Sequence, residues 1–163
     1  MNPRGKHGQS DLFLNEFIKI INRKDLIQGS FPKVNREMET TFISRTQRRM
    51  DILIEWTTNG IMIENKPWAD DQYEQILDYK RNLEKRYNDK FIIVYLSKSF
   101  QNPSEESISQ NDLDILIQKN QFIQISYENE LLLWIKNCIK ESQSEKMRHF
   151  LKDFSNYLND NFN

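Results

Sequence analysis

Apolar residues change their spacing along this chain, and each change predicts a different kind of element. In residues 11–22 they recur three and four positions apart, as on one face of an amphipathic helix. Residues 91–97 are almost continuously apolar, which is typical of a strand covered on both faces. Residues 130–139 and 145–158 return to helical spacing. The chain therefore combines helices with at least one buried strand.

The middle of the chain predicts a β-hairpin. Two runs rich in β-branched residues, Ile52–Trp56 and Ile61–Ile63, flank a Thr-Thr-Asn-Gly segment. Asn59 and Gly60 suit the positive φ angles of a tight turn, so we expect the two runs to pair as antiparallel strands.

The remaining segments complete an order of elements. Residues 25–37, with Gly29 and Pro32, are expected to be irregular, and residues 38–44 to form the first strand. We further expect residues 68–71 to lead into a long helix that ends at about Tyr87, followed by a short helix over 112–119 and a last strand over 122–127. A strand, a helix and another strand make a crossover unit with parallel pairing. The order αβββαβ(α)βαα therefore predicts an α/β fold, with a mixed central sheet flanked by helices.

Length and composition predict one folded domain over residues 1–163. A chain of 163 residues, 37% of them hydrophobic, is long enough to bury one core. Within it we expect residues 1–9 to be flexible and residues 130–163 to form a helical extension that packs on the core.

Charge and cysteine content limit the classes of function. The 23 basic and 24 acidic residues nearly cancel, so a nucleic-acid partner must be met by a local basic patch. The single cysteine, Cys138, suits a reducing compartment, and we expect a cytoplasmic protein. No apolar run is long enough for a membrane span, and the polar start differs from a signal peptide. Zinc-binding Cys/His patterns and glycine-rich phosphate loops are absent from the sequence.

Charged residues at the ends of the hairpin strands are the main candidates for chemistry. Asp51 precedes the first run, whereas Glu64 and Lys66 end the second. Residues two apart in a strand share a face, and neighbouring strands lie about 4.8 Å apart, so Asp51 could lie beside Glu64. Two adjacent carboxylates are costly unless a cation or a proton neutralises them, which is the physical case for a metal site. The alternative is a solvent-facing ion pair.

The set Asp51, Glu64 and Lys66, in the spacing Asp-x12-Glu-x-Lys, resembles the PD-(D/E)XK nuclease superfamily, which has the restriction-endonuclease-like fold. Gln75 and Tyr79 are similar to the Q-x-x-x-Y helix element of a bacterial subgroup of that family. The resemblance covers roughly residues 5–135.

The resemblance implies a role for each of these residues. Asp51 and Glu64 would hold Mg²⁺, with Mn²⁺ as an alternative ion, and Lys66 would assist the attacking water. We add the Asn65 carbonyl as a candidate metal ligand, because Mg²⁺ prefers hard oxygen donors. Gln75 and Tyr79 would contact the phosphate or position the region around Lys66.

Further residues are weaker candidates. Glu39 and Glu16 are candidate accessory acids, although Glu39 is equally expected on a solvent-facing side of its strand and for Glu16 a solvated helix face is the preferred interpretation. Basic residues that could face phosphates, or simply form charged surface, are Arg45, Arg48, Arg49 and Lys80.

Taken together, the sequence predicts an Mg²⁺-dependent nuclease that hydrolyses phosphodiester bonds, with DNA as the expected substrate. A role in bacterial defence or DNA processing is an association drawn from the resemblance. A homodimer is expected if the protein cuts both strands of a duplex. The alternative is a DNA- or protein-binding module of the same fold that does not cut.

Overall fold

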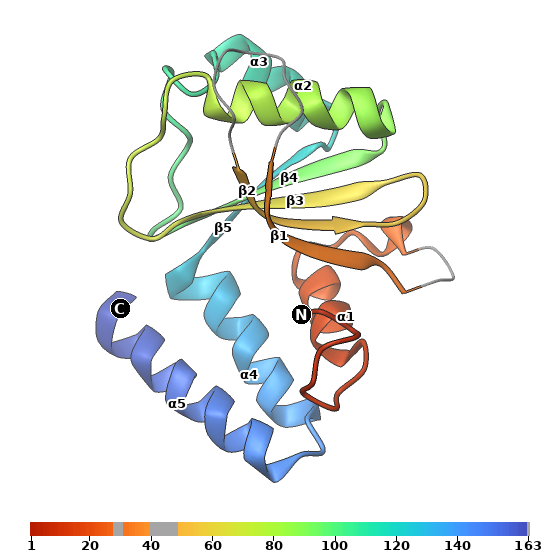
Figure 1. Ribbon diagram of the computed structural model, residues 1–163. Helices are drawn as coiled ribbons and strands as arrows, with labels where there is room; N and C mark the ends of the chain where they lie inside the picture. The colour runs from red at the N-terminus through yellow and green to blue at the C-terminus, as the bar shows by residue number, and fades with distance from the viewer. Residues whose placement is uncertain (28–30, 40–48, 163) are drawn as a thin grey trace.

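A five-stranded sheet lies between two layers of helices in the computed structural model, which describes residues 1–27, 31–39 and 49–162 (Figure 1). The strands are β1 (Lys33–Glu39), β2 (Arg49–Glu55), β3 (Gly60–Lys66), β4 (Phe91–Ser97) and β5 (Phe122–Ser126). The helices are α1 (Leu12–Ile20), α2 (Gln75–Tyr87), α3 (Gln110–Gln118), α4 (Leu132–Glu141) and α5 (Glu145–Phe162). Two short helical turns, η1 (Lys24–Leu26) and η2 (Tyr127–Leu131), complete the described elements.

The sheet is mixed and follows the chain, in the order β1-β2-β3-β4-β5. Strands β1, β2 and β3 pair antiparallel, whereas β3, β4 and β5 pair parallel. The parallel connections run through α2 and α3, which lie on one face of the sheet, and α1, α4 and α5 lie on the other (Figure 1). The predicted α/β class and element order are confirmed, and the architecture is consistent with a restriction-endonuclease-like fold.

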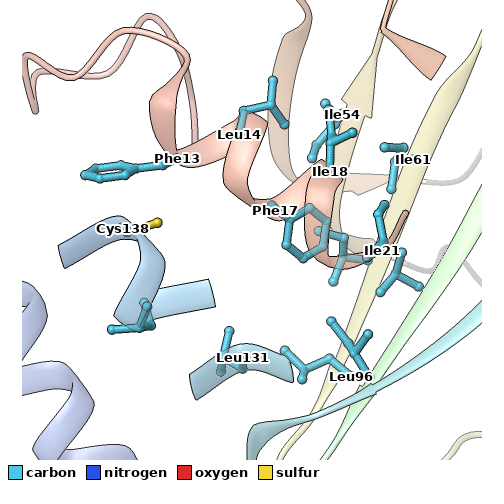
Figure 2. Close-up of a cluster of buried hydrophobic side chains, with 14 of the residues drawn as sticks. Phe13, Leu14, Phe17, Ile18, Ile21, Ile54, Ile61, Leu96, Leu131 and Cys138 are labelled. Atoms are coloured by element: carbon cyan, nitrogen blue, oxygen red, sulfur yellow. The ribbon is translucent and has the colours of Figure 1, made fainter. Parts of the chain in front are cut away.

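The core consists of two apolar clusters, one on each face of the sheet. On one face, α1 packs Phe17 and Ile18 toward Ile54 and Ile61 of the hairpin (Figure 2). On the other, Tyr79 and its neighbours on α2 pack against the second cluster. Strand β4 contributes side chains to both clusters, and all seven of its residues are buried. Burial on both faces explains its continuous apolar sequence.

The hairpin forms as predicted, but glycine at position 60 is needed for a reason other than the expected positive φ angle. Gly60 lies in strand β3, paired with Glu55, and its φ angle is not positive. The turn is instead closed by the Trp56 amide, which donates to the Asn59 carbonyl at 2.9 Å. A Cβ atom at position 60 would lie 2.6 Å from the Tyr87 ring. Glycine is therefore required by close packing rather than by backbone conformation.

Two predicted boundaries are wrong. Residues 33–37 were expected to be irregular but belong to edge strand β1, where burial follows no regular alternation. The long helix was expected to follow directly after residues 68–71, yet α2 begins at Gln75, after Glu74 with a φ of 52°. Of the first strand expected over residues 38–44, residues 40–44 lie outside the described part of the chain.

Both ends of the chain lie on the face of the sheet that α1, α4 and α5 cover (Figure 1). Within residues 1–9, for which we expected flexibility, Met1 packs against the core and the His7 ring contacts Phe13. Residues from α4 and α5, including Cys138 and Leu158, belong to the cluster on this face of the sheet. Among the described residues, the structure contains no helix with the length and apolar character needed to cross a membrane.

Candidate nuclease site

The candidate residues gather where strand β3 ends. Met62 belongs to the cluster under α2, whereas Ile61 and Ile63 belong to the cluster on the opposite face. Because side chains alternate along a strand, Glu64 and Lys66 face α2, and Asn65 faces the other side. The sequence-based expectation that Glu64 and Lys66 share a face agrees with this arrangement.

Glu64 is held in place through one of its two oxygens. Gln75 Nε2 donates to Glu64 Oε1 at 2.7 Å, and Lys66 Nζ lies 3.3 Å from the same oxygen. Glu64 is only 2% exposed, and within the described part of the chain no group hydrogen-bonds to its Oε2. A buried carboxylate oxygen without a partner is costly, so this atom is suited to a ligand that the protein itself does not supply.

Helix α2 holds this arrangement through a short hydrogen-bond chain. Gln75 Nε2 also donates to the Tyr79 hydroxyl at 3.0 Å, and that hydroxyl donates to the Arg49 carbonyl at 2.8 Å. Gln75 and Tyr79 are one helical turn apart and therefore share a face of α2. These hydrogen bonds connect β3, α2 and β2.

Asp51 approaches the same place from the neighbouring strand. In the register of β2 and β3, Ile52 pairs with Ile63, so Asp51 follows one position beyond this pair. Asp51 Oδ2 accepts a hydrogen bond from the Asn65 backbone amide at 2.8 Å. The second acid is thereby tied to the backbone between Glu64 and Lys66.

The proximity of the two acids changes the ionisation of Glu64. Burial, and then repulsion from the Asp51 carboxylate, raise the pKa of Glu64 from 4.5 to about 7, although Lys66 partly opposes this shift. Burial and the Glu64 charge also raise the pKa of Tyr79, which therefore stays protonated and able to donate its hydrogen bond. Perturbed ionisation of this kind is frequent at functional sites.

Lys66 lies inside the protein with its ammonium group anchored. It is 9% exposed, and its Nζ donates to the Asp70 carbonyl at 3.2 Å in addition to its contact with Glu64. The Lys66 ammonium group balances the charge of Glu64, but when both carboxylates are charged this single positive charge leaves the trio net negative. The donor set of Asp51 and Glu64 oxygens therefore fits a hard divalent cation.

Two acidic side chains, Asp51 and Glu64, are the candidate side-chain ligands of a metal at this site. Over residues 1–27, 31–39 and 49–162, no cluster of three or more His, Cys, Asp or Glu side chains is placed to hold a metal. The remaining ligands of a divalent ion would thus be backbone carbonyls such as that of Asn65, water and substrate oxygens.

A cleft of about 1100 Å³ leads to this region from the face covered by α1 and α4. Asp51, Asn65 and Tyr127 line it, together with Trp134 and Arg36. The cleft gives Asp51 a route to solvent, whereas Glu64 and Lys66 are almost fully covered.

The accessory acids are not brought to Asp51. Glu16 bonds to Lys19 and lines a separate cleft beside α1. Glu39 is exposed and pairs in register with Arg49 at the far end of β1. Glu37, which we had not singled out, lines the Asp51 cleft instead. The backbone of Glu37 has a φ of 51°, which interrupts the strand. The regular alternation of side chains along a strand does not predict such an interruption.

The expected basic contacts have different surroundings. The Arg49 side chain is 64% exposed and lies 3.8 Å from Glu37 at the edge of the cleft. Lys80 instead binds Asp112 of α3 at 2.8 Å. Arg45 and Arg48 lie outside the described residues.

Sequence reasoning also missed Tyr127. Its hydroxyl donates to the Asn65 side chain across 62 positions of sequence. It begins the π-helical turn after β5, and β5 was predicted to end at this residue. Only the tertiary structure shows this contact, since no local pattern links the two positions.

The chain was compared with known families and proteins. A family model described as the PD-(D/E)XK nuclease superfamily matches residues 1–156. Comparison with curated proteins and with solved structures gave no match. The matched range contains Asp51, Glu64 and Lys66, and it covers most of the chain. The chain therefore belongs to the PD-(D/E)XK nuclease superfamily.

Proposed function

We propose that this protein is an Mg²⁺-dependent nuclease that hydrolyses phosphodiester bonds in DNA. The observation that carries the proposal is the Glu64 carboxylate, fixed through Oε1 by Gln75 and Lys66 while Oε2 has no partner among the described residues. Family membership supports nuclease chemistry on nucleic acid and the use of a divalent metal. Mn²⁺ is an alternative ion, since it also prefers oxygen ligands.

In this proposal Asp51, Glu64 and the Asn65 carbonyl hold the ion. When bound, the ion supplies Lewis-acid activation of water and neutralises charge on the scissile phosphate. Lys66 orients the attacking water and stabilises the negative charge that develops on the phosphoryl oxygens. Gln75 and Tyr79 fix the orientation of the Glu64 carboxylate, so little reorganisation is needed when substrate binds.

The Q-x-x-x-Y resemblance of Gln75 and Tyr79 stays a prediction, as does a role in bacterial defence or DNA processing. A cytoplasmic location is proposed because the single cysteine is buried and reduced. A homodimer would place two sites on opposite strands of a duplex.

A supercoiled plasmid tests the proposed reaction. With Mg²⁺ or Mn²⁺ the wild-type protein should nick or linearise the plasmid, and EDTA should abolish the reaction. Lys66→Ala and Asp51→Ala should each lower the rate by at least roughly 100-fold. Lys152→Ala and Asp153→Ala change the same residue types on the exposed side of α5 and should leave the rate unchanged.

A different result would favour the alternative. Plasmid binding without cleavage by a folded wild-type protein, under all metal conditions, would support a binding module that does not cut. The balanced formal charge of −1 is compatible with such a module.

A further inference from the structure

Three aromatic rings form a continuous stack beside the candidate site. Phe162, at the end of α5, stacks on Tyr127 with ring centroids 4.3 Å apart and on Trp68 with centroids 4.7 Å apart. The interplanar angles are 16° and 19°, so the three rings are nearly parallel. Phe162 itself is 4% exposed and fills the space between the other two.

The stack extends from the candidate site to the surface. At its inner end the Tyr127 hydroxyl donates to Asn65, which lies between Glu64 and Lys66. At its outer end Trp68 follows Lys66 by two positions and is 61% exposed. Any group bound on the outer ring is therefore close to the proposed reaction.

A cation accompanies the exposed ring. Lys98 Nζ lies 5.1 Å from the centroid of the Trp68 ring. Lys98 follows Ser97, which pairs with Lys66 in the register of β3 and β4. The exposed indole, supported by Phe162, and the ammonium group over its ring match the two parts of a nucleotide: a base would stack on the ring in place of the ammonium group, and the flexible Lys98 side chain would move to pair with the phosphate.

Core packing alone does not account for this arrangement. Trp68 covers the outer face of Phe162, yet this contact leaves Trp68 itself 61% exposed. Support by Phe162 lowers the entropy that Trp68 would lose on binding a base, which favours stacking of a ligand.

We propose that Trp68 and Lys98 form a subsite for an unpaired nucleotide of the DNA substrate, next to the scissile phosphate. Bases in a duplex are stacked on their neighbours and have no free face, whereas bases of a single strand, an overhang or a frayed end can stack on Trp68. The substrate class is thus DNA with an unpaired segment. This inference rests on the proposed nuclease function for the reaction, but it concerns binding.

Tryptophan fluorescence tests the subsite without cleavage. The full-length protein in EDTA is titrated with a twelve-nucleotide oligo(dT) and, separately, with a blunt twelve-base-pair hairpin duplex. Oligo(dT) should quench the wild-type emission and the duplex should not. Trp68→Phe should abolish the quenching while binding, followed by fluorescence anisotropy of labelled oligo(dT), is retained. Trp56→Phe, which changes a buried tryptophan of the core that does not line the Asp51 cleft, should keep the quenching.

The binding affinities of two variants separate the contribution of the Trp68 ring from that of the Lys98 ammonium group. Trp68→Ala should weaken oligo(dT) binding by roughly tenfold, because one stacking partner is lost. Lys98→Ala should weaken it less and should reduce the dependence of log K on log salt by about 0.7. Circular dichroism should show that both variants stay folded.

The outcomes distinguish the subsite from the nuclease function. Quenching that persists in Trp68→Phe, or that is equally strong with the duplex, would overturn the subsite. If the plasmid assay shows metal-dependent cleavage in that case, the nuclease function still stands. Quenching that depends on Trp68, in a protein that cuts nothing, would support the subsite and contradict the nuclease function.

Discussion

Gln75 donates from Nε2 to Glu64 Oε1 at 2.7 Å, and this bond links helix α2 to the carboxylate on β3. The same nitrogen donates to the Tyr79 hydroxyl. Gln75, together with Lys66, therefore sets which oxygen of Glu64 faces the protein and which remains without a partner among the described residues. Gln75 is accordingly a positioning residue in the proposed site.

Replacing Gln75 should impair the reaction more than the fold. In Gln75→Ala the Glu64 carboxylate keeps Lys66 but loses its amide donor, so we expect the cleavage rate to fall by about tenfold or more. The free energy of unfolding should fall by about 1–2 kcal/mol. Gln118→Ala, an exposed change of the same type on α3, should affect neither quantity. Raising the Mg²⁺ concentration should recover part of the lost rate, which a purely structural defect would not allow.

The raised pKa of Glu64 predicts a pH dependence of stability. Its pKa is 4.5 in its ordinary environment and about 7 in the folded protein. Between these values the folded, metal-free protein holds a proton that the unfolded chain has released. The free energy of unfolding therefore falls as pH rises through this window, by on the order of 1–3 kcal/mol. The contribution is complete below pH 4.5 and is lost above about pH 7.

Urea denaturation in EDTA between pH 5 and pH 8 measures this effect. Glu64→Gln removes the ionising group and keeps its shape, so its stability relative to wild type should increase with pH. Parallel pH profiles for the two proteins would show that the buried carboxylate does not titrate in this range.

Two basic residues should differ in their effect on DNA binding. Arg49 is exposed at the edge of the cleft, so Arg49→Ala should weaken DNA binding by a few fold and reduce the salt dependence by about one contact. Lys80 is already paired with Asp112 at 2.8 Å, and Lys80→Ala should leave affinity within about twofold. Fluorescence anisotropy at several salt concentrations checks both variants. The reverse ranking would mean that α2, rather than β2, faces the DNA.

The close contact of Gly60 predicts a stability defect. In Gly60→Ala the new methyl group would lie 2.6 Å from the Tyr87 ring, and the ring cannot move freely because its hydroxyl donates to Glu55. We expect the free energy of unfolding to fall by about 1–3 kcal/mol in urea denaturation. Tyr87→Leu in the same chain should relieve part of the clash, so the two changes together should cost less than their sum. Strict additivity would argue against the contact.

Elements with a strong local pattern were predicted well. Strand β4 was predicted with the bounds Phe91–Ser97 that the structure shows, because burial on both faces leaves a continuous apolar run. Helix α5 was predicted to begin at Glu145, where its apolar spacing starts. Glu64 and Lys66 were predicted to share a face because alternation along a strand is a local property.

Features that depend on tertiary contacts were missed. Residues 72–74 have no proline or glycine to separate them from α2, but Asp71 just before them accepts hydrogen bonds from Tyr95 and Ser104 and holds the segment as a loop. The Tyr127 contact with Asn65 joins positions 62 residues apart. The irregularity at Glu37 lies on an edge strand, where the weak burial pattern gives no register.

A Mn²⁺-soaked crystal of the wild-type protein tests directly whether Asp51 and Glu64 together hold a divalent cation, because manganese can be located by its anomalous scattering. We expect a peak within bonding distance of one oxygen of Asp51 and of Glu64 Oε2. The peak should be absent from crystals of Asp51→Ala treated in the same way. A peak that touches neither acid, or no peak at saturating Mn²⁺ with the Asp51 carboxylate turned away from Glu64, would contradict the account.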